Sequence, residues 1–263
     1  RSRFRFFYII MNKFFLNLGK QPLANNFLTK FSPKQPTYNL KLYFNTKTKM
    51  VSISKRIPSS IMFNSKYPYR SSMSITMRNS FKKLSDEIKK RFKPNLLLEI
   101  GSNDGALIKN FDKNKVIGVE PCKNLAKITK KIDYKTFDKY WDFELAKKIK
   151  SEFKSVDVIY SANTITHISN LDNVFKSICH ILAENGVVII EDPSLLQCLK
   201  KNSYDQFYNE HIYLFSTLSV KNLLSKFKEI IFSNDNYNCS FDILLTLVNN
   251  YIFLNKLIFV SYT

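Results

Sequence analysis

Apolar runs alternate with amphipathic segments over the middle of the chain. Four continuous apolar runs have the length and composition of buried strands: 96–100, 116–119, 156–160 and 186–190. Three further segments space their apolar residues as helices do: 125–131, 143–153 and 174–182. We also expect a helix to begin at 106–111 and a short strand near Tyr134. Strands interleaved with helices predict an α/β fold with a doubly wound, mainly parallel sheet.

The flanks of this region have weaker patterns. Residues 74–92 space their apolar positions as a helix does and end before Pro94, which predicts a helix leading into the sheet. Residues 12–66 hold scattered prolines, and 38–53 alternate weakly, as hairpin strands would. We therefore expect three parts: a small irregular N-terminal module at 1–73, the α/β domain at 74–233 and a divergent tail at 234–263.

A glycine-bracketed turn follows the first apolar run. The chain has five glycines, and Gly101 and Gly105 stand close together in LLLEIGSNDG. Such a turn lets the backbone approach a ligand at the carboxyl end of a parallel strand. The turn lacks the three-glycine spacing of dinucleotide folds and the Gly-Lys-Ser/Thr of phosphate-binding loops, so it favours a nucleotide-type cofactor without phosphates. Glu120 ends the second run, 19 residues after Gly101, where its carboxylate could accept hydrogen bonds from both ribose hydroxyls.

Together, EIGSNDG and GVEP resemble the first motif and the acidic second motif of the class I S-adenosylmethionine-dependent methyltransferases. The resemblance implies a Rossmann-like sheet and S-adenosylmethionine as cofactor. In that family the glycine loop passes the methionine and ribose, and the acid after the second strand holds the ribose. The implied cofactor-binding residues are Glu99, Gly101, Ser102, Asn103, Gly105, Glu120, Pro121 and Asn163.

Two of the three histidines follow predicted sheet strands. His167 follows the run at 156–160, and His211 lies beyond the next run, in SYDQFYNEHIYLFS. Both segments converge on the cofactor edge of a parallel sheet, where titratable imidazoles suggest proton transfer. The competing interpretations are a packing role for His167 and a surface loop around His211. His180 falls within a predicted helix, and we expect it to be structural.

A closer resemblance covers about residues 18–224. LGKQPLANNFL, YPYRSSMS, EIGSNDG, NTITHI and YNEHIYLFS are together similar to sugar C-methyltransferases, which methylate a ring carbon beside a ketone in nucleotide-linked deoxysugars. The resemblance implies a nucleotide-sugar substrate and His211 as general base. Glu210 would orient or polarise the site, while His167 and tyrosine hydroxyls would stabilise an enolate oxygen. The implied catalytic residues are His211, Glu210, Tyr208, His167 and Tyr69, with Tyr67 as the less favoured tyrosine.

The sequence departs from that family at both ends. The family carries a small zinc module built from two cysteine pairs, but the first cysteine here is Cys122, and Asn45 and Thr48 stand where one pair would lie. We therefore expect no metal site. After YLFS the family continues through a second α/β half introduced by a glycine-rich segment, and no glycine follows Gly186 here. We expect a truncated acceptor half, so that activity could be impaired.

Composition leaves two rival functions open. Lys plus Arg number 41 against 21 Asp plus Glu, a net charge of +20, which suggests an anionic partner. The lysines are spread along the chain rather than gathered in a stripe, so we do not expect nucleic acid. The rivals are a methyltransferase acting on RNA or another small molecule, and an inactive relative that only binds cofactor.

Cysteine usage and the apolar ends bear on location. The four cysteines are far apart and form no CxxC pair, which favours a reducing, cytoplasmic environment. Polar residues interrupt the apolar stretches at both ends, so we expect neither a signal peptide nor a membrane span. The sequence does not indicate an oligomeric state.

Overall fold

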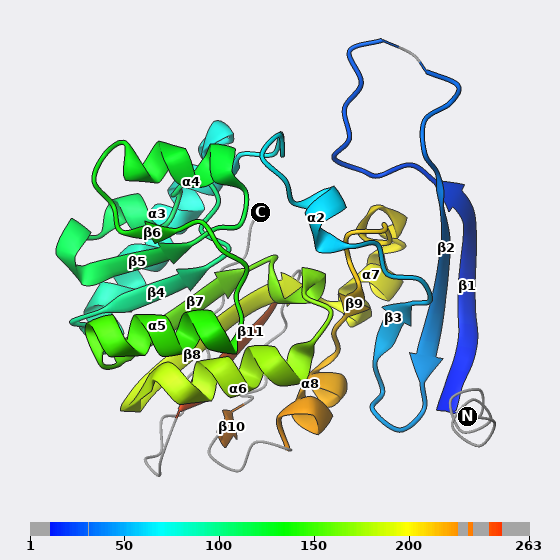
Figure 1. Cartoon of the computed structure of the whole chain (residues 1–263). Helices are drawn as coiled ribbons and strands as arrows, with labels where there is room; N and C mark the ends of the chain where they lie inside the picture. The colour runs from blue at the N-terminus through cyan, green and yellow to red at the C-terminus, as the bar shows by residue number, and fades with distance from the viewer. Residues whose placement is uncertain (1–10, 31, 226–230, 234–241, 249–263) are drawn as a thin grey trace.

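The computed structural model describes residues 11–30, 32–225, 231–233 and 242–248. Within them a large sheet has the strand order β10-β11-β8-β7-β4-β5-β6 (Figure 1). Its parallel strands are β4 (Leu97–Ile100), β5 (Val116–Val119), β6 (Thr136–Phe137), β7 (Val156–Ala162) and β8 (Leu182–Pro193). β11 (Asp242–Val248) pairs antiparallel with β8, and β10 (Ile231–Ser233) pairs antiparallel with β11 at the edge of the sheet. The predicted doubly wound, mainly parallel sheet is confirmed.

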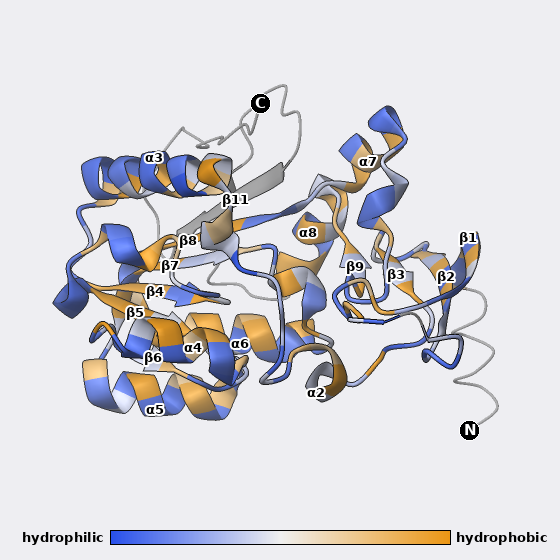
Figure 2. Ribbon diagram, turned by 90° about the horizontal axis from the view of Figure 1, so that it is seen from above, coloured by the Kyte–Doolittle hydropathy of each residue, from blue (hydrophilic) through white to orange (hydrophobic). Residues whose placement is uncertain are grey.

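Helices cover both faces of this sheet (Figure 2). α3 (Ile75–Phe92) packs Phe81, Leu84 and Ile88 on one face. α5 (Phe143–Phe153) and α6 (Leu171–Ile181) bury apolar side chains on the other, and α4 (Lys123–Lys130) lies between β5 and β6 in the chain. Local chemistry sets the ends of α3, because Ser74 caps its first turn and Lys93 takes a left-handed conformation before Pro94.

The prediction that a helix begins at 106–111 is wrong. The chain there forms only a short 3₁₀ turn, η2 (Ile108–Asn110). The side-chain amide of Asn110 donates to the carbonyls of Ala106 and Leu107, at 2.9 and 3.1 Å. These carbonyls would otherwise accept backbone N–H groups from the next turn of an α-helix, so the side chain competes with helix propagation.

The N-terminal module contains a four-stranded antiparallel sheet, in which the hairpin strands expected at 38–53 are confirmed. The order is β1 (Asn12–Gln21), β2 (Tyr38–Asn45), β3 (Val51–Ile53) and β9 (Tyr213–Leu214). β1 is exposed or half-buried along its length, so it lacks the apolar alternation that marks a strand in a sequence. The Asn45 carboxamide oxygen accepts the N–H groups of Lys47 and Thr48 and thereby shapes the β2–β3 turn.

The remaining elements are short. They are α2 (Ser59–Met62), α7 (Leu195–Lys201), α8 (Thr217–Leu224), η1 (Ser71–Met73), η3 (Lys113–Lys115), η4 (Ile165–His167) and η5 (Tyr204–Gln206). None of the helices within the described ranges is long and apolar enough to cross a membrane. β11 falls within the segment expected to be a divergent tail, while residues 1–10 and 249–263 of the expected termini lie outside the described residues.

The chain between η5 and α8 joins the two sheets. The Ile212 N–H donates to the Thr166 carbonyl of η4, and the Ile212 carbonyl accepts from Ile53 of β3, both at 3.0 Å. Phe207, Ile212 and Leu214 are buried in the core of the N-terminal module. Residues 208–211 are thereby placed at the carboxyl edge of the large sheet, next to the N-terminal module.

The loop after β4 yields a stability prediction with an internal control. Gly101 has a φ of 79°, and a Cβ there would lie 2.1 Å from Thr164 Oγ1, whereas Gly19, with a φ of 73°, has nothing within 4 Å of such a Cβ. We expect Gly19→Ala to lower the free energy of unfolding by about 1 kcal/mol, through backbone strain alone. Gly101→Ala should lower it by about 2–4 kcal/mol, because steric overlap adds to the strain. Urea denaturation of both variants measures the difference, and equal losses would contradict the predicted overlap.

Candidate active site

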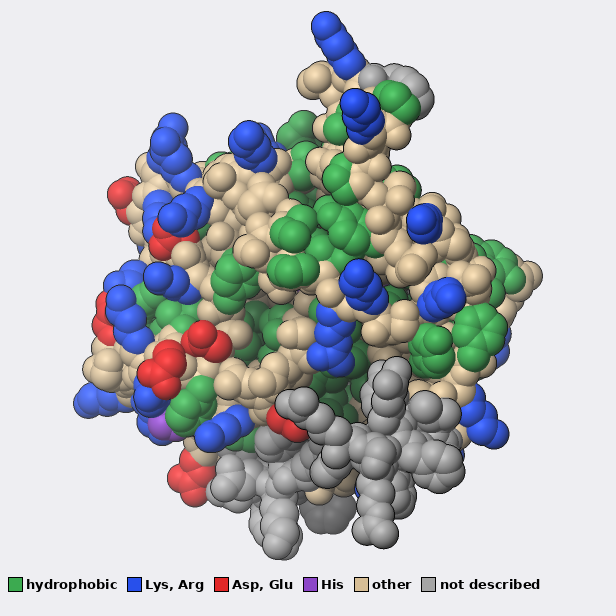
Figure 3. All heavy atoms as spheres, turned by 45° about the vertical axis from the view of Figure 1, so that its right-hand side comes forward, with side chains coloured by type: hydrophobic (Ala, Val, Ile, Leu, Met, Phe, Trp, Pro, Cys, Tyr) green, Lys and Arg blue, Asp and Glu red, His purple; other side chains and the backbone are tan. Residues whose placement is uncertain are grey.

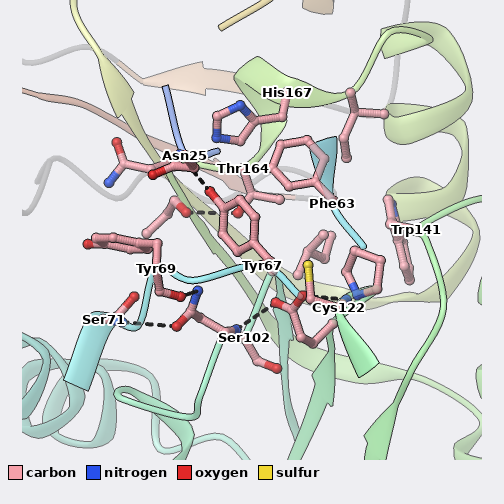
Figure 4. Close-up of a pocket in the computed structure, with 18 of the residues that line it drawn as sticks. Asn25, Phe63, Tyr67, Tyr69, Ser71, Ser102, Cys122, Trp141, Thr164 and His167 are labelled. Atoms are coloured by element: carbon pink, nitrogen blue, oxygen red, sulfur yellow. Dashed lines mark hydrogen bonds between the residues drawn. The ribbon is translucent and has the colours of Figure 1, made fainter. Parts of the chain in front are cut away.

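A cavity of about 690 Å³ lies at the carboxyl ends of β4, β5 and β7 (Figure 4). Its volume falls in the range of small-molecule pockets. Gly101, Glu120 and Asn163 line it from the loops after these strands, and Tyr208 and His211 line it from the segment that joins the two sheets. The two groups of polar residues singled out in the sequence therefore share one cavity.

Most of the predicted site residues line this cavity. They are Glu99, Gly101, Ser102, Asn103, Glu120, Pro121, Asn163, Tyr69, His167, Tyr208 and His211. Gly105 is not among the lining residues. Its φ is 85° and a Cβ there would lie 2.5 Å from Thr129 Cγ2, so glycine at this position serves the backbone of the turn. The Glu210 carboxylate is also not part of the lining and bonds instead to Asn25 and Tyr67.

Glu120 connects the glycine loop to the start of α4. One carboxylate oxygen accepts from Asn103 N and the other from Cys122 N, both at 2.8 Å. Burial raises the pKa of Glu120, and these backbone N–H groups oppose the rise. Each carboxylate oxygen can accept more than one hydrogen bond, so the held carboxylate can still accept donors from a ligand in the cavity.

The same end of the cavity holds buried acceptors without a protein partner. Glu99 Oε2 and Ser102 Oγ have no hydrogen-bond partner, although both residues are almost fully buried. Burial and the nearby Glu120 carboxylate raise the pKa of Glu99 well above its ordinary value. A ligand that brings hydrogen-bond donors and positive charge would satisfy both groups.

Cations are lacking where a phosphate would need them. Among the described residues, no lysine or arginine lines the cavity, although the chain carries 41 of them. On the face drawn in Figure 3 these side chains are scattered rather than gathered. The end of the cavity lined by Glu99, Ser102 and Glu120 is called the donor end below. It thus suits a cationic, ribose-containing molecule such as S-adenosylmethionine better than a phosphate-bearing cofactor.

His211 and Tyr208 form a hydrogen-bonded pair. Nδ1 of His211 lies 2.9 Å from the Gln206 carbonyl, which can only accept, so Nδ1 carries the proton. Burial, and then the neighbouring His167, lower the pKa of His211 to about 3, so the ring is neutral and Nε2 is an acceptor. The Tyr208 hydroxyl donates to Nε2 at 2.6 Å. Burial and the nearby Glu210 charge raise the pKa of Tyr208.

His167 is oriented in the same way. Its Nδ1 lies 2.8 Å from the Glu210 carbonyl and donates to it. Burial lowers the pKa of His167 to about 4, which leaves Nε2 of a neutral ring as an acceptor. The ring packs between Phe63 and His211, with centroid separations of 5.1 and 5.0 Å.

Asn25 and Tyr67 contribute to the site, although the sequence predicted Tyr67 only as the less favoured tyrosine and did not predict Asn25. The Asn25 side-chain amide donates to Glu210 Oε2 at 2.7 Å and to the Tyr67 hydroxyl at 3.1 Å. The Tyr67 hydroxyl in turn donates to Glu210 Oε2 at 3.3 Å. Tyr69, the favoured tyrosine, lines the cavity with 46% of its surface exposed. Asn25 lies in LGKQPLANNFL, one of the segments similar to the sugar C-methyltransferases. An asparagine in a loop carries no periodic signal that could reveal its contact.

Residues 67–72 link the two ends of the cavity. At the end near Tyr208 and His211, called the acceptor end below, Tyr67 contacts Glu210. At the donor end, Ser71 N donates to Asn103 Oδ1 at 2.9 Å, and both the N–H and the hydroxyl of Ser72 bond to the Asp104 carboxylate. This segment therefore bridges the glycine loop and the Glu210 region.

Metal ligands are not grouped in the described parts of the chain. No cluster of three or more His, Cys, Asp and Glu side chains there could hold a metal ion. At the position of one zinc pair in the resembled family, Asn45 instead holds the turn that includes Thr48.

Comparison with known proteins identifies the family. The profile of the methyltransferase domain matches residues 69–227. The curated C-methyltransferase NovU of Streptomyces niveus is 25% identical over 212 residues, which cover 78% of this chain and 50% of NovU. The chain therefore spans about half the length of this curated relative.

Solved structures share the fold. The plantazolicin methyltransferase BpumL in complex with SAH superposes with a TM-score of 0.51 at 12% identity, covering 67% of this chain and 85% of that one. BpumL with SAH and a triazolic desmethylPZN analog gives a TM-score of 0.52 at 12% identity, covering 68% and 87%. With its doubly wound sheet, its glycine loop and a family profile that spans more than half of its length, the chain belongs to the class I S-adenosylmethionine-dependent methyltransferases.

Proposed function

We propose that the protein methylates the carbon beside a ketone of a nucleotide-linked sugar, through an enolate generated by a base. The observation that carries this proposal is the pair formed by Tyr208 and the neutral His211, which lines the same cavity as Glu120. Oxygen or nitrogen acceptors can be methylated with less assistance, but a carbon beside a ketone becomes nucleophilic only after it loses a proton.

Residues at the donor end would hold the cofactor. Glu120 would accept hydrogen bonds from the ribose hydroxyls, and the unpartnered Glu99 and Ser102 oxygens would accept further donors. S-adenosylmethionine, when bound, supplies the electrophilic methyl group that the enolate carbon takes. The carboxylates would favour its positive charge.

The proton has a defined route in this arrangement. The Tyr208 hydroxyl already donates to His211 Nε2, so its oxygen can take a proton from the substrate carbon as its own proton moves to Nε2. The carbon–hydrogen bond breaks, its electron pair forms the enolate, and His211 becomes an imidazolium. The Gln206 carbonyl holds Nδ1–H throughout and keeps Nε2 directed at Tyr208.

Tyrosine hydroxyls are the natural donors to the enolate oxygen. A neutral His167 whose Nδ1–H is donated to Glu210 has no second proton to offer at Nε2. The single proton of the Tyr67 hydroxyl is likewise donated to Glu210, so stabilisation of the oxyanion falls to Tyr69, which lines the cavity. Glu210, bonded to the Tyr67 hydroxyl, would orient that group.

Two kinds of support separate this proposal from its rivals. NovU carries the name C-methyltransferase, and the YNEHIYLFS segment that resembles the sugar enzymes supplies the proton-transfer pair. The described lining contains no lysine or arginine, which bears equally on RNA and on a nucleotide sugar because both carry phosphates, so the acceptor assay decides between them. A thymidine-diphosphate keto-sugar should gain one methyl group by mass spectrometry, whereas methylation of RNA alone would overturn the proposal.

The donor end can be tested by binding. Glu120→Gln should weaken S-adenosylhomocysteine about 10- to 100-fold in calorimetry, because a charged acceptor of ribose hydroxyls becomes a neutral amide. Glu152→Gln, which removes a surface carboxylate paired with Lys135, is the matched control and should bind as the wild type does. Equal affinities for both variants would remove Glu120 from the cofactor site.

The proton-transfer pair can be tested by turnover. His211→Ala should lower kcat/KM for the keto-sugar nucleotide by about 10²- to 10⁴-fold, because general base catalysis is lost. Tyr208→Phe should lower it in the same direction. Affinity for S-adenosylhomocysteine should stay within a few-fold, and His180→Ala, which alters the C-terminal end of α6, should leave both quantities unchanged. A parallel loss of cofactor affinity in His211→Ala would contradict the assignment.

The neutral state of His211 predicts a pH dependence of stability. The folded-state pKa of about 3 lies below the unfolded value of 6.5. The unfolded chain therefore binds more protons in this window, and the contribution of His211 to stability falls as the pH drops below about 6.5. In His211→Gln the free energy of unfolding should vary less steeply with pH between 6 and 4, by up to about 1.4 kcal/mol per pH unit. Identical slopes in urea denaturation would show that the ring is not held neutral.

A further inference from the structure

Asn25 belongs to the N-terminal module, yet its backbone N–H and its side-chain amide both bond to a residue at the acceptor end of the active site. It lies in the loop between β1 and β2. Its side-chain amide donates to Glu210 Oε2 at 2.7 Å and its backbone N–H donates to Glu210 Oε1 at 3.3 Å. The two residues are separated by 185 positions in the chain. Both oxygens of one carboxylate are thus held by a single residue.

The Glu210 carboxylate has few other means of support. The residue is 1% exposed, and among the described residues no lysine or arginine forms an ion pair with it. The Tyr67 hydroxyl donates to Oε2 at the longer distance of 3.3 Å. A buried carboxylate without a cation depends on hydrogen-bond donors, and Asn25 provides two of the three seen here.

Glu210 also fixes other parts of the site. Its carbonyl accepts the Nδ1–H of His167, and its side chain bonds to Tyr67. Its neighbour His211 carries the proposed proton acceptor. A displacement of Glu210 would therefore disturb Tyr67, His167 and the neighbouring His211.

We infer that Asn25 is a positioning residue, by which the N-terminal module fixes the Glu210 carboxylate and completes the acceptor end of the cavity. The inference rests on the proposed function for its catalytic consequence, but the contact itself does not. It gives the N-terminal sheet a role in the reaction that needs no metal: β1 and β2 carry the loop that presents Asn25 to the site.

Asn25 should also control the charge of Glu210. Burial raises the pKa of Glu210, while the donors of Asn25 and Tyr67 oppose this rise by favouring the carboxylate. The other titratable groups in electrostatic contact with it are Tyr208 and Cys122, and His167 contacts its backbone. None of these groups is a cation while His167 is neutral, so none of them can replace the Asn25 amide in stabilising the carboxylate. Loss of that amide should therefore move the titration of Glu210 to higher pH.

The test compares neighbouring asparagines in the full chain. Asn25→Asp keeps the shape of the side chain and replaces a donor by a charged acceptor, and Asn26→Asp makes the same charge change at an exposed neighbour. Asn25→Ala and Asn26→Ala form a second pair. Carbon-13 NMR of glutamate-labelled protein, with Glu210 assigned through Glu210→Gln, should show its titration at higher pH in both Asn25 variants and unchanged in both Asn26 variants.

Turnover adds a second readout. The Asn25 variants should lower kcat for the keto-sugar nucleotide about 10- to 100-fold through misplaced groups, and should shift the acidic limb of the pH–rate profile to higher pH. Affinity for S-adenosylhomocysteine should stay within a few-fold. If Glu210 titrates alike in the Asn25 and Asn26 variants, the inference is overturned. If even the wild type methylates no keto-sugar nucleotide, the proposed function fails, while the titration still decides the role of Asn25.

Discussion

The active site depends on how the backbone at Ile212 is held from two sides. Its N–H bonds to Thr166 in the large sheet's loop region, and its carbonyl bonds to Ile53 in the N-terminal sheet. Buried backbone groups must be paired, and these two bonds tie the residue to both parts of the fold. Tyr208, Glu210 and His211 lie just before it, and their positions follow from that junction. A methyltransferase sheet alone would hold the cofactor end, but it would leave the proposed proton-transfer pair without support from the module.

Charge is distributed in opposite ways inside and outside the cavity. The chain has a net charge of +20, yet the described lining of the cavity carries carboxylates and no lysine or arginine. At the donor end this arrangement favours a cation. At the acceptor end two imidazoles lie 5.0 Å apart. Burial lowers the pKa of each ring, and the neighbouring His167 lowers the pKa of His211 further, so both rings are neutral and Nε2 of His211 can accept a proton.

Local sequence signals predicted the elements that build the donor end. Continuous apolar runs identified β4, β5 and β7, and the positions of Gly101 and Glu120 at their ends followed directly. Non-local pairings were not predictable in this way. β1 is mostly exposed and has no alternating pattern, and the β3–β9 pairing joins Val51 to Leu214 across most of the chain. The contact between Asn25 and Glu210 is of the same kind, because nothing in the spacing of either residue refers to the other.

The segment at 67–72 shows why the boundary between module and domain does not divide the function. The sequence places it at the end of the N-terminal module, whereas the methyltransferase profile begins at residue 69. Its contacts belong to both parts, since Ser71 and Ser72 bond to the glycine loop and Tyr67 bonds to Glu210. Hydrogen bonds at both ends of this six-residue segment therefore connect the glycine loop at Asn103 and Asp104 with the acceptor end at Glu210, through a stretch of chain that contains no glycine or histidine.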